Sequence, residues 1–116
     1  VTVGSAGSFP SGSATLTPEA RDIMKKIADA SENSKGVVTV SGHTDDVPLV
    51  FGGRYRDNWD LAAARSASVV QELSSSGKIN ESNLQAISYG ESRPVETNET
   101  VEGRAKNRRI EIEINY

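Results

Sequence analysis

The densest group of side chains with chemical potential is Ser41-Gly42-His43-Thr44-Asp45-Asp46, directly after an apolar run that predicts a buried strand. Ligands of open α/β sheets bind near the carboxyl ends of strands, so this position favours a functional site. An enzyme could use Asp45 and Asp46 as a carboxylate pair, with His43 as a base or metal ligand. Adjacent residues of an extended loop point apart, however, and no second histidine stands at a metal-binding spacing. We therefore expect no catalysis, no metal and no cofactor.

Two other groups of polar residues follow along the chain. The run Asn58-Trp59-Asp60-Leu61-Ala62-Ala63-Ala64-Arg65 is typical of a capped helix with a solvated arginine, but its three alanines also leave room for a ligand. Residues 104–109 hold four cations, which could contact phosphates. No aromatic residue lies among these cations, so we favour a solvated or anion-facing loop and expect no nucleic-acid binding.

The composition describes one small folded domain. The chain has 116 residues, of which 25% are charged and 5% are aromatic, and 13 basic against 16 acidic residues give a net charge of −3. This balance argues against a general binder of nucleic acid or anionic membranes. The sequence contains no cysteine, which excludes disulfides and thiol chemistry. No apolar run is long enough to span a bilayer, and the start at Val1 suggests a fragment of a longer protein.

The elements that must position these groups follow from apolar periodicity and capping signals. Helices are predicted from Thr17-Pro18-Glu19 to about Asn33, and from Asn58 to a stop at Ser74–Gly77. Strands are predicted at 37–40, 84–89 and 110–115, the last with strict alternation of isoleucine and polar residues. Strands interleaved with two helices predict a two-layer α/β sandwich, with the helices on one face of a mixed sheet.

The remaining stretches are predicted to lack regular structure over most of their length. Long loops are predicted at 43–57 and 90–106, the second with a short helical turn after Thr97. Residues 1–17 begin with a β-like run and continue into a Gly/Ser-rich stretch with few apolar side chains, chiefly Phe9, Ala14 and Leu16. The order of this stretch must therefore come from contacts with the rest of the chain. We predict a flexible N-terminal segment at 1–17 and a folded domain at 18–116.

Taken together, the motifs resemble the OmpA-like peptidoglycan-binding domain, from about Phe9 to Ile114. The resemblance rests on Ser41–Asp46, on Asn58-Trp59-Asp60-Leu61 with Arg65, on Tyr89-Gly90-Glu91-Ser92-Arg93-Pro94, on Asn98 with Thr100, and on Gly103-Arg104-Ala105 with Asn107-Arg108-Arg109-Ile110-Glu111-Ile112. Two details, Asp46 with Pro48 and the Asn-Trp-Asp-Leu start of the helix, are similar to the B subunit of the bacterial flagellar stator, the MotB/PomB type.

The resemblance implies a site for diaminopimelate, a residue in the peptide stem of peptidoglycan. Diaminopimelate carries an ammonium and a carboxylate on one carbon, so its site needs an anion and a cation close together. Asp45 matches the family position that takes the ammonium, and Arg65 matches the one that takes the carboxylate through its planar fork. Asn58 and Leu61 match positions that line the site at the helix start, where free N–H groups favour an anion.

Several neighbouring residues have roles that the resemblance fixes less firmly. Thr44 and Arg108 also match site positions, although Arg108 could instead brace the loop of Asp45. For His43, Asp46 and Trp59 we favour structural roles, namely loop hydrogen bonds, a loop cap and packing, respectively.

The resemblance also implies the biological setting. It implies a non-enzymatic anchor that holds the ion-driven flagellar stator against the cell wall, in the periplasmic domain of an inner-membrane protein. Its partners would be peptidoglycan, a second copy of the chain, and the stator A subunit (MotA/PomA type) through a membrane region outside this sequence. The alternative within the family is an envelope anchor of the Pal or OmpA type without a motor role.

Overall fold

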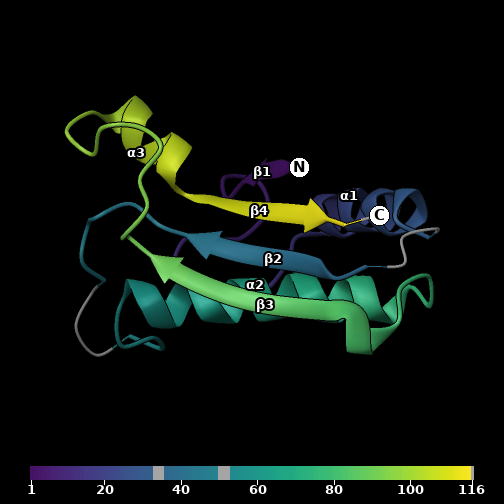
Figure 1. Ribbon diagram of the computed structural model, residues 1–116. Coiled ribbons are helices and arrows are strands. Elements are labelled where there is room, and N and C mark those ends of the chain that lie inside the picture. Colours follow the sequence, from purple (N-terminus) through teal and green to yellow (C-terminus); the bar gives the residue numbers. More distant parts are fainter. Residues whose placement is uncertain (33–35, 50–52, 116) are drawn as a thin grey trace.

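Four strands form one mixed sheet in the computed structural model, which describes residues 1–32, 36–49 and 53–115. The strand order is β1-β4-β2-β3 (Figure 1). The central strand β2 is parallel to β3 and antiparallel to β4, and β4 is antiparallel to the short β1. The strands span Thr2–Gly4 (β1), Val38–His43 (β2), Leu84–Gly90 (β3) and Arg109–Ile114 (β4).

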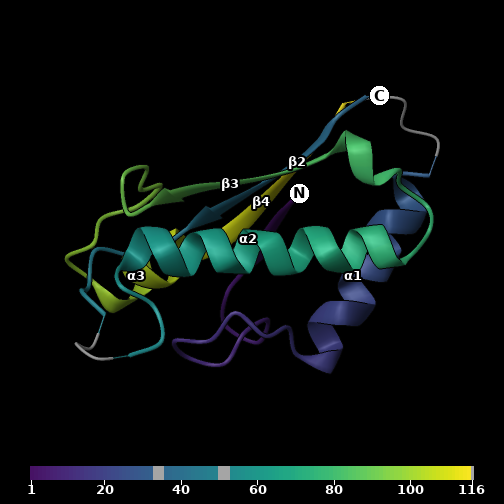
Figure 2. The ribbon, with the colours of Figure 1, turned by 90° about the horizontal axis from the view of Figure 1, so that it is seen from below.

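The two long helices cover one face of this sheet. They are α1 (Pro18–Ala30) and α2 (Asn58–Ser75), and Figure 2 shows α2 crossing the sheet with α1 beside its far end. A single turn of 3-10 helix, Glu81–Asn83, leads into β3, and the short α3 (Val101–Asn107) lies where β4 begins (Figure 1). The predicted two-layer α/β sandwich, with helices on one face of a mixed sheet, is confirmed.

An aliphatic core fills the space between the helices and the sheet. On β2 and β4 every second residue faces the helices, as the strict alternation in the sequence predicts for β4. Each fully buried aliphatic side chain contributes about 1.5–3 kcal/mol relative to an exposed one. The main side chains of this core are Met24, Ile27, Val38, Val40, Val69, Leu73, Ile110 and Ile112.

The N-terminal segment lies against this core. Its three chief apolar residues, Phe9, Ala14 and Leu16, are all buried. The flexibility predicted for residues 1–17 stays a prediction. The Thr17 hydroxyl accepts a hydrogen bond from the Ala20 N–H at 3.2 Å and so caps α1. The boundary between a separate segment at 1–17 and a domain at 18–116 stays a prediction.

The largest departures from the sequence prediction lie at the ends of three elements. Strand β2 continues to His43, beyond the predicted end at Val40, because residues 41–43 still pair with both neighbouring strands. Helix α1 is assigned to Ala30, and the predicted end at Asn33 lies outside the described residues. In place of one turn after Thr97, α3 begins after Thr100 and runs to Asn107.

Candidate ligand-binding cleft

One cleft of about 640 Å³ brings together all six residues predicted for the site. It opens where β2 ends, and its walls are the loop after β2, the first turns of α2, the residue before β4 and the N-terminal segment. The residues predicted from the sequence and found in its lining are Thr44, Asp45, Asn58, Leu61, Arg65 and Arg108. The N-terminal wall, which the sequence did not predict, adds Ser5, Ala6, Phe9, Ser11 and Gly12.

The Asp45 carboxylate is held from two sides. Its Oδ2 accepts a hydrogen bond from Arg108 Nη1 in an ion pair of 2.6 Å, and its Oδ1 accepts from the Val47 N–H at 3.1 Å. The Asp45 side chain is 11% exposed, whereas that of Arg108 is 38% exposed. The anion is therefore fixed and largely buried, while its cationic partner reaches it from the surface of the cleft.

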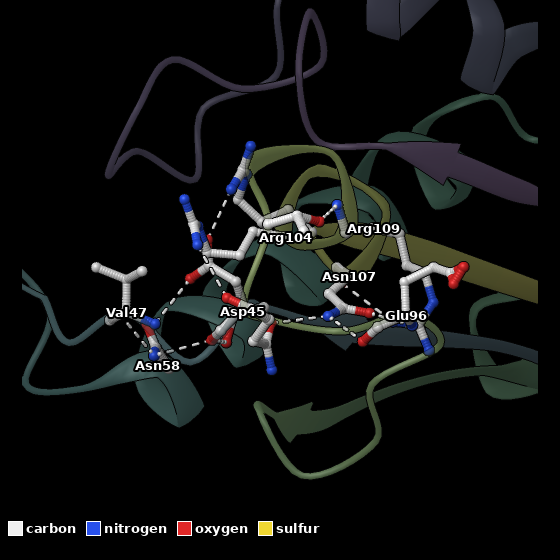
Figure 3. Close-up of polar contacts among 12 residues, drawn as sticks. Asp45, Val47, Asn58, Glu96, Arg104, Asn107 and Arg109 are labelled. Carbon is white, nitrogen blue, oxygen red and sulfur yellow. Dashed lines mark hydrogen bonds and ion pairs between the residues drawn. The ribbon is translucent and has the colours of Figure 1, made fainter.

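The backbone around Asp45 is fixed by side chains of the same site. The Asn58 Nδ2 group donates to the carbonyls of Asp45 at 3.2 Å and Val47 at 3.0 Å, and Figure 3 shows these three residues side by side. The Thr44 hydroxyl donates to the Asp45 carbonyl at 2.8 Å, and the Thr44 N–H donates to the Gly90 carbonyl of β3 at 2.8 Å. Four hydrogen bonds thus hold the loop that presents the carboxylate.

The start of α2 contributes to the cleft in a different way from the one predicted. The N-cap is Asp57, whose carboxylate accepts from the Asp60 N–H at 2.9 Å, so one of the free N–H groups expected to attract an anion already has an anionic partner. Asn58 acts through its side chain on the loop, as described above. Leu61 is 4% exposed and adds an apolar surface to the cleft.

Arg65 is buried, and its partners are backbone carbonyls. Its Nε donates to the Ser13 carbonyl at 2.8 Å and its Nη2 to the Pro10 carbonyl at 3.4 Å, while the guanidinium carbon lies 4.9 Å from the centre of the Phe9 ring. Burial lowers the pKa of Arg65, and the nearby Tyr55 and Asp45 oppose this shift whereas Arg108 adds to it. An arginine nevertheless stays protonated. Within the described part of the chain, no carboxylate lies at ion-pair distance from it.

Residues of the OmpA-like motif after β3 build the support of Arg108. The Thr100 hydroxyl caps α3 by accepting from the Gly103 N–H at 2.9 Å, and Gly103 lies so close to the Thr97 carbonyl that a Cβ atom there would collide with it. Asn107 is fully buried, and its side chain makes four hydrogen bonds to the 95–98 loop (Figure 3). This network fixes the end of α3 and therefore the position of the next residue, Arg108.

Residues 8–108 match the OmpA family over most of the chain. The chain belongs to the OmpA family. Motility protein B of Bacillus subtilis is 35% identical over 105 residues, which cover 90% of this chain and 40% of that protein. This chain therefore spans less than half the length of that relative.

Solved structures of OmpA-like domains have the same fold. A MotB-like protein from Desulfovibrio vulgaris matches with a TM-score of 0.91 and 31% identity, over 98% of this chain and 73% of that one. The cell wall anchor of the T6SS from Pseudomonas aeruginosa matches with a TM-score of 0.85 and 38% identity, over 96% of this chain and 76% of that one. The names of these relatives describe motility and anchoring proteins.

The other residues of the predicted clusters lie outside the cleft of this OmpA-family domain. The buried His43 stacks on Tyr89 with ring centres 5.3 Å apart, and among the described residues neither of its ring nitrogens has a hydrogen-bond partner. The structural role of His43 is thus packing, and the prediction that its side chain makes loop hydrogen bonds is wrong. The sequence predicts the loop cap for Asp46, but the Asp45 carboxylate makes it by accepting a hydrogen bond from the Val47 N–H, while Asp46 is exposed. Trp59 is 47% exposed and lies over Gly90, which agrees with packing.

No group of three or more metal-ligating side chains gathers within the ranges 1–32, 36–49 and 53–115. In the same ranges, no helix has both the length and the apolar character needed to cross a membrane.

Proposed function

We propose that this chain binds peptidoglycan without catalysis, and that Asp45 takes the ammonium and Arg65 the carboxylate of diaminopimelate in the stem peptide. The observation that carries the proposal is the arrangement of charge. A buried anion, Asp45, and a buried cation, Arg65, line one cleft without pairing with each other: Asp45 pairs with Arg108, and Arg65 donates to backbone carbonyls. A ligand that carries both charges on one carbon suits such a pair, because each charge-assisted hydrogen bond strengthens its binding.

The remaining residues of the cleft have supporting roles in this proposal. Thr44 and Asn58 fix the loop of Asp45, and Leu61 offers an apolar surface to the methylene groups of the stem residue. Arg108 balances the charge of Asp45 until the ligand's ammonium arrives. Its side chain, 38% exposed, can then move toward solvent, because the ligand's ammonium replaces its charge beside the largely buried Asp45.

We further propose that the chain anchors the ion-driven flagellar stator to the cell wall. The relatives support this step, because they include a motility protein and a cell wall anchor. The chain would be the periplasmic domain of an inner-membrane protein and would meet the stator A subunit through a membrane region outside this sequence. A homodimer would carry two anchors, so that weak binding at each site would suffice. The alternative is a Pal-type or OmpA-type envelope anchor without a motor.

Retention on insoluble peptidoglycan tests the site. Asp45→Asn and Arg65→Ala should each weaken retention about ten-fold or more, because a hydrogen bond to a charged group is worth about 1.5–3 kcal/mol. The matched controls are Asp22→Asn and Arg21→Ala on the exposed face of α1, which should leave retention unchanged. A stem tripeptide with lysine in place of diaminopimelate lacks only the carboxylate and should compete poorly. Wild-type retention of either cleft variant, with an intact circular dichroism spectrum, would overturn the site.

DNA-cellulose tests the rival interpretation of the basic cluster. Three of its four cations already have partners: Arg104 donates to the Asn98 carbonyl, Arg108 pairs with Asp45, and Arg109 pairs with Glu111. We therefore expect no retention on DNA at physiological salt. The motor role needs a separate test, in cells that carry the Asp45→Asn variant of the full-length protein. Loss of swimming with flagella still present would support a stator anchor, whereas envelope leakage with normal swimming would support the alternative.

A further inference from the structure

The N-terminal segment supplies the contacts that orient Arg65. The two carbonyls that accept its hydrogen bonds belong to Pro10 and Ser13, and the ring beside its guanidinium belongs to Phe9. The segment is itself fastened to α2 one turn further on, where the Ser68 hydroxyl donates to the Ala14 carbonyl at 2.6 Å. The cation that we assign to ligand binding is therefore positioned from outside its own helix.

These contacts leave one edge of the guanidinium available. They engage Nε and Nη2, and no described residue accepts a hydrogen bond from Nη1. A carboxylate needs donors in the guanidinium plane, so the plane must be held at a defined angle to the cleft. The two carbonyls restrain part of the plane, and the face of the Phe9 ring restrains its tilt.

Phe9 is well suited to hold a buried cation. It is 5% exposed, and so is Arg65, so water does not screen the attraction between the guanidinium and the ring face. Cation–π attraction is strongest in such desolvated places. Phe9 also lines the cleft, which places its ring beside the same space that the ligand would enter.

We propose that Phe9 is a positioning residue for carboxylate recognition by Arg65. This inference rests on the proposed function and names one more residue on which selectivity for a carboxylate depends. Because Phe9 also belongs to the aliphatic core together with Leu16, a loss of stability alone would not distinguish positioning from packing. The experiment must therefore read out selectivity for the carboxylate.

The experiment measures the affinity of the whole chain for two stem tripeptides, one with meso-diaminopimelate and one with lysine as the third residue. Phe9→Leu keeps an apolar side chain but removes the ring face. It should weaken binding of the diaminopimelate peptide about five-fold or more, and should leave the lysine peptide nearly unchanged. Phe9→Tyr should keep the preference. Leu16→Val, in the same segment and the same core, should lower stability without changing the preference between peptides.

A double-mutant cycle with Arg65→Ala separates the possible failures. If positioning is correct, Phe9→Leu has no further effect once Arg65 is gone. If Phe9→Leu binds like the wild type, or weakens both peptides equally in both backgrounds, the positioning role is overturned and the site stands. If Arg65→Ala itself binds like the wild type, the proposed site fails and this inference fails with it.

A second variant covers the case in which Phe9→Leu does not fold. Fluorination of the Phe9 ring keeps its shape while it weakens the negative potential of the ring face. Binding of the diaminopimelate peptide should fall stepwise with the number of fluorine atoms, and binding of the lysine peptide should not. An affinity that does not depend on fluorination would overturn the positioning role.

Discussion

Arg108 and Arg109 are consecutive residues, and each ends in an ion pair of 2.6 Å, yet the two pairs have opposite exposure. In the cleft the carboxylate of Asp45 is 11% exposed and its partner Arg108 is 38% exposed. On the other face of the sheet Arg109 is 5% exposed, and its partner Glu111 is 42% exposed. The cleft pair therefore buries its anion, whereas the other pair buries its cation.

The two arginines also differ in how many hydrogen bonds each would lose if it left its partner. Arg109 also donates to the carbonyls of Asn107 at 3.0 Å and Arg93 at 3.1 Å, so its removal would leave two carbonyl groups without their partner. Among the described residues, the Arg108 side chain has one hydrogen-bond partner, Asp45. Under the proposed function, a ligand ammonium would replace Arg108 as the counter-ion of Asp45, whereas Arg109 would stay with its partners.

The largest effect on stability should therefore come from Arg109. We expect Arg109→Ala to lower the free energy of unfolding by about 2–4 kcal/mol, because a buried cation and its hydrogen bonds to carbonyls are lost together. Urea unfolding measures this change. Arg56→Ala, whose side chain is 88% exposed, is the matched control and should stay within about 0.5 kcal/mol of the wild type. If Arg109→Ala lowered the free energy of unfolding no more than Arg56→Ala does, Arg109 would not be part of the framework of the fold.

A smaller and salt-dependent effect should come from Arg108. We expect Arg108→Gln to lower the free energy of unfolding by about 1 kcal/mol at low ionic strength, and by less at high ionic strength, since the Arg108 end of the pair is exposed to solvent and is screened by salt. Urea unfolding in about 0.05 M and 0.5 M sodium chloride measures both values. In the Asp45→Asn background the same change should have almost no effect. A salt-independent loss as large as that from Arg109→Ala would erase the distinction between the two pairs.

The sequence predicts the elements whose signals are local. Strict alternation of Ile110, Ile112 and Ile114 predicts β4, and Thr17-Pro18 predicts the start of α1, because periodicity and capping are properties of neighbouring residues. The pairing of a site anion with a site cation came from the family resemblance. Residue types and spacing alone argued against catalysis at Asp45 but named no ligand for it.

The parts that the sequence did not predict depend on distant contacts. Helix α3 has no apolar stripe, and it is fixed by a cap, a close glycine and the side chain of Asn107. The partners of Arg65 are carbonyls far away in the chain. Every residue has a carbonyl, so no pattern of side-chain types could reveal those contacts.

The smallest effect concerns His43, which lies beside the ion pair of Arg109 and Glu111. Its Nε2 is 3.7 Å from Glu111 Oε2. Burial lowers the pKa of His43, the charges of Arg109 and Arg93 lower it further, and Glu111 opposes them. The unfolded chain then binds a proton at a higher pH than the folded one. Stability should be fully present above the ordinary histidine pKa of about 6.5 and should fall as the pH falls below it.

His43→Phe keeps a ring against Tyr89 and removes the proton-binding group. Between about pH 7.5 and pH 5.5 the free energy of unfolding should fall less in this variant than in the wild type, by a difference below about 1.5 kcal/mol. The comparison is clean because His43 is the sole histidine of the sequence, and unperturbed carboxylates titrate nearer pH 4. Urea unfolding at several pH values measures both curves. Parallel curves of unfolding free energy against pH would show that burial and the nearby arginines do not oppose a charge on His43. A steeper fall in the variant would mean that its surroundings raise the pKa of His43 instead of lowering it.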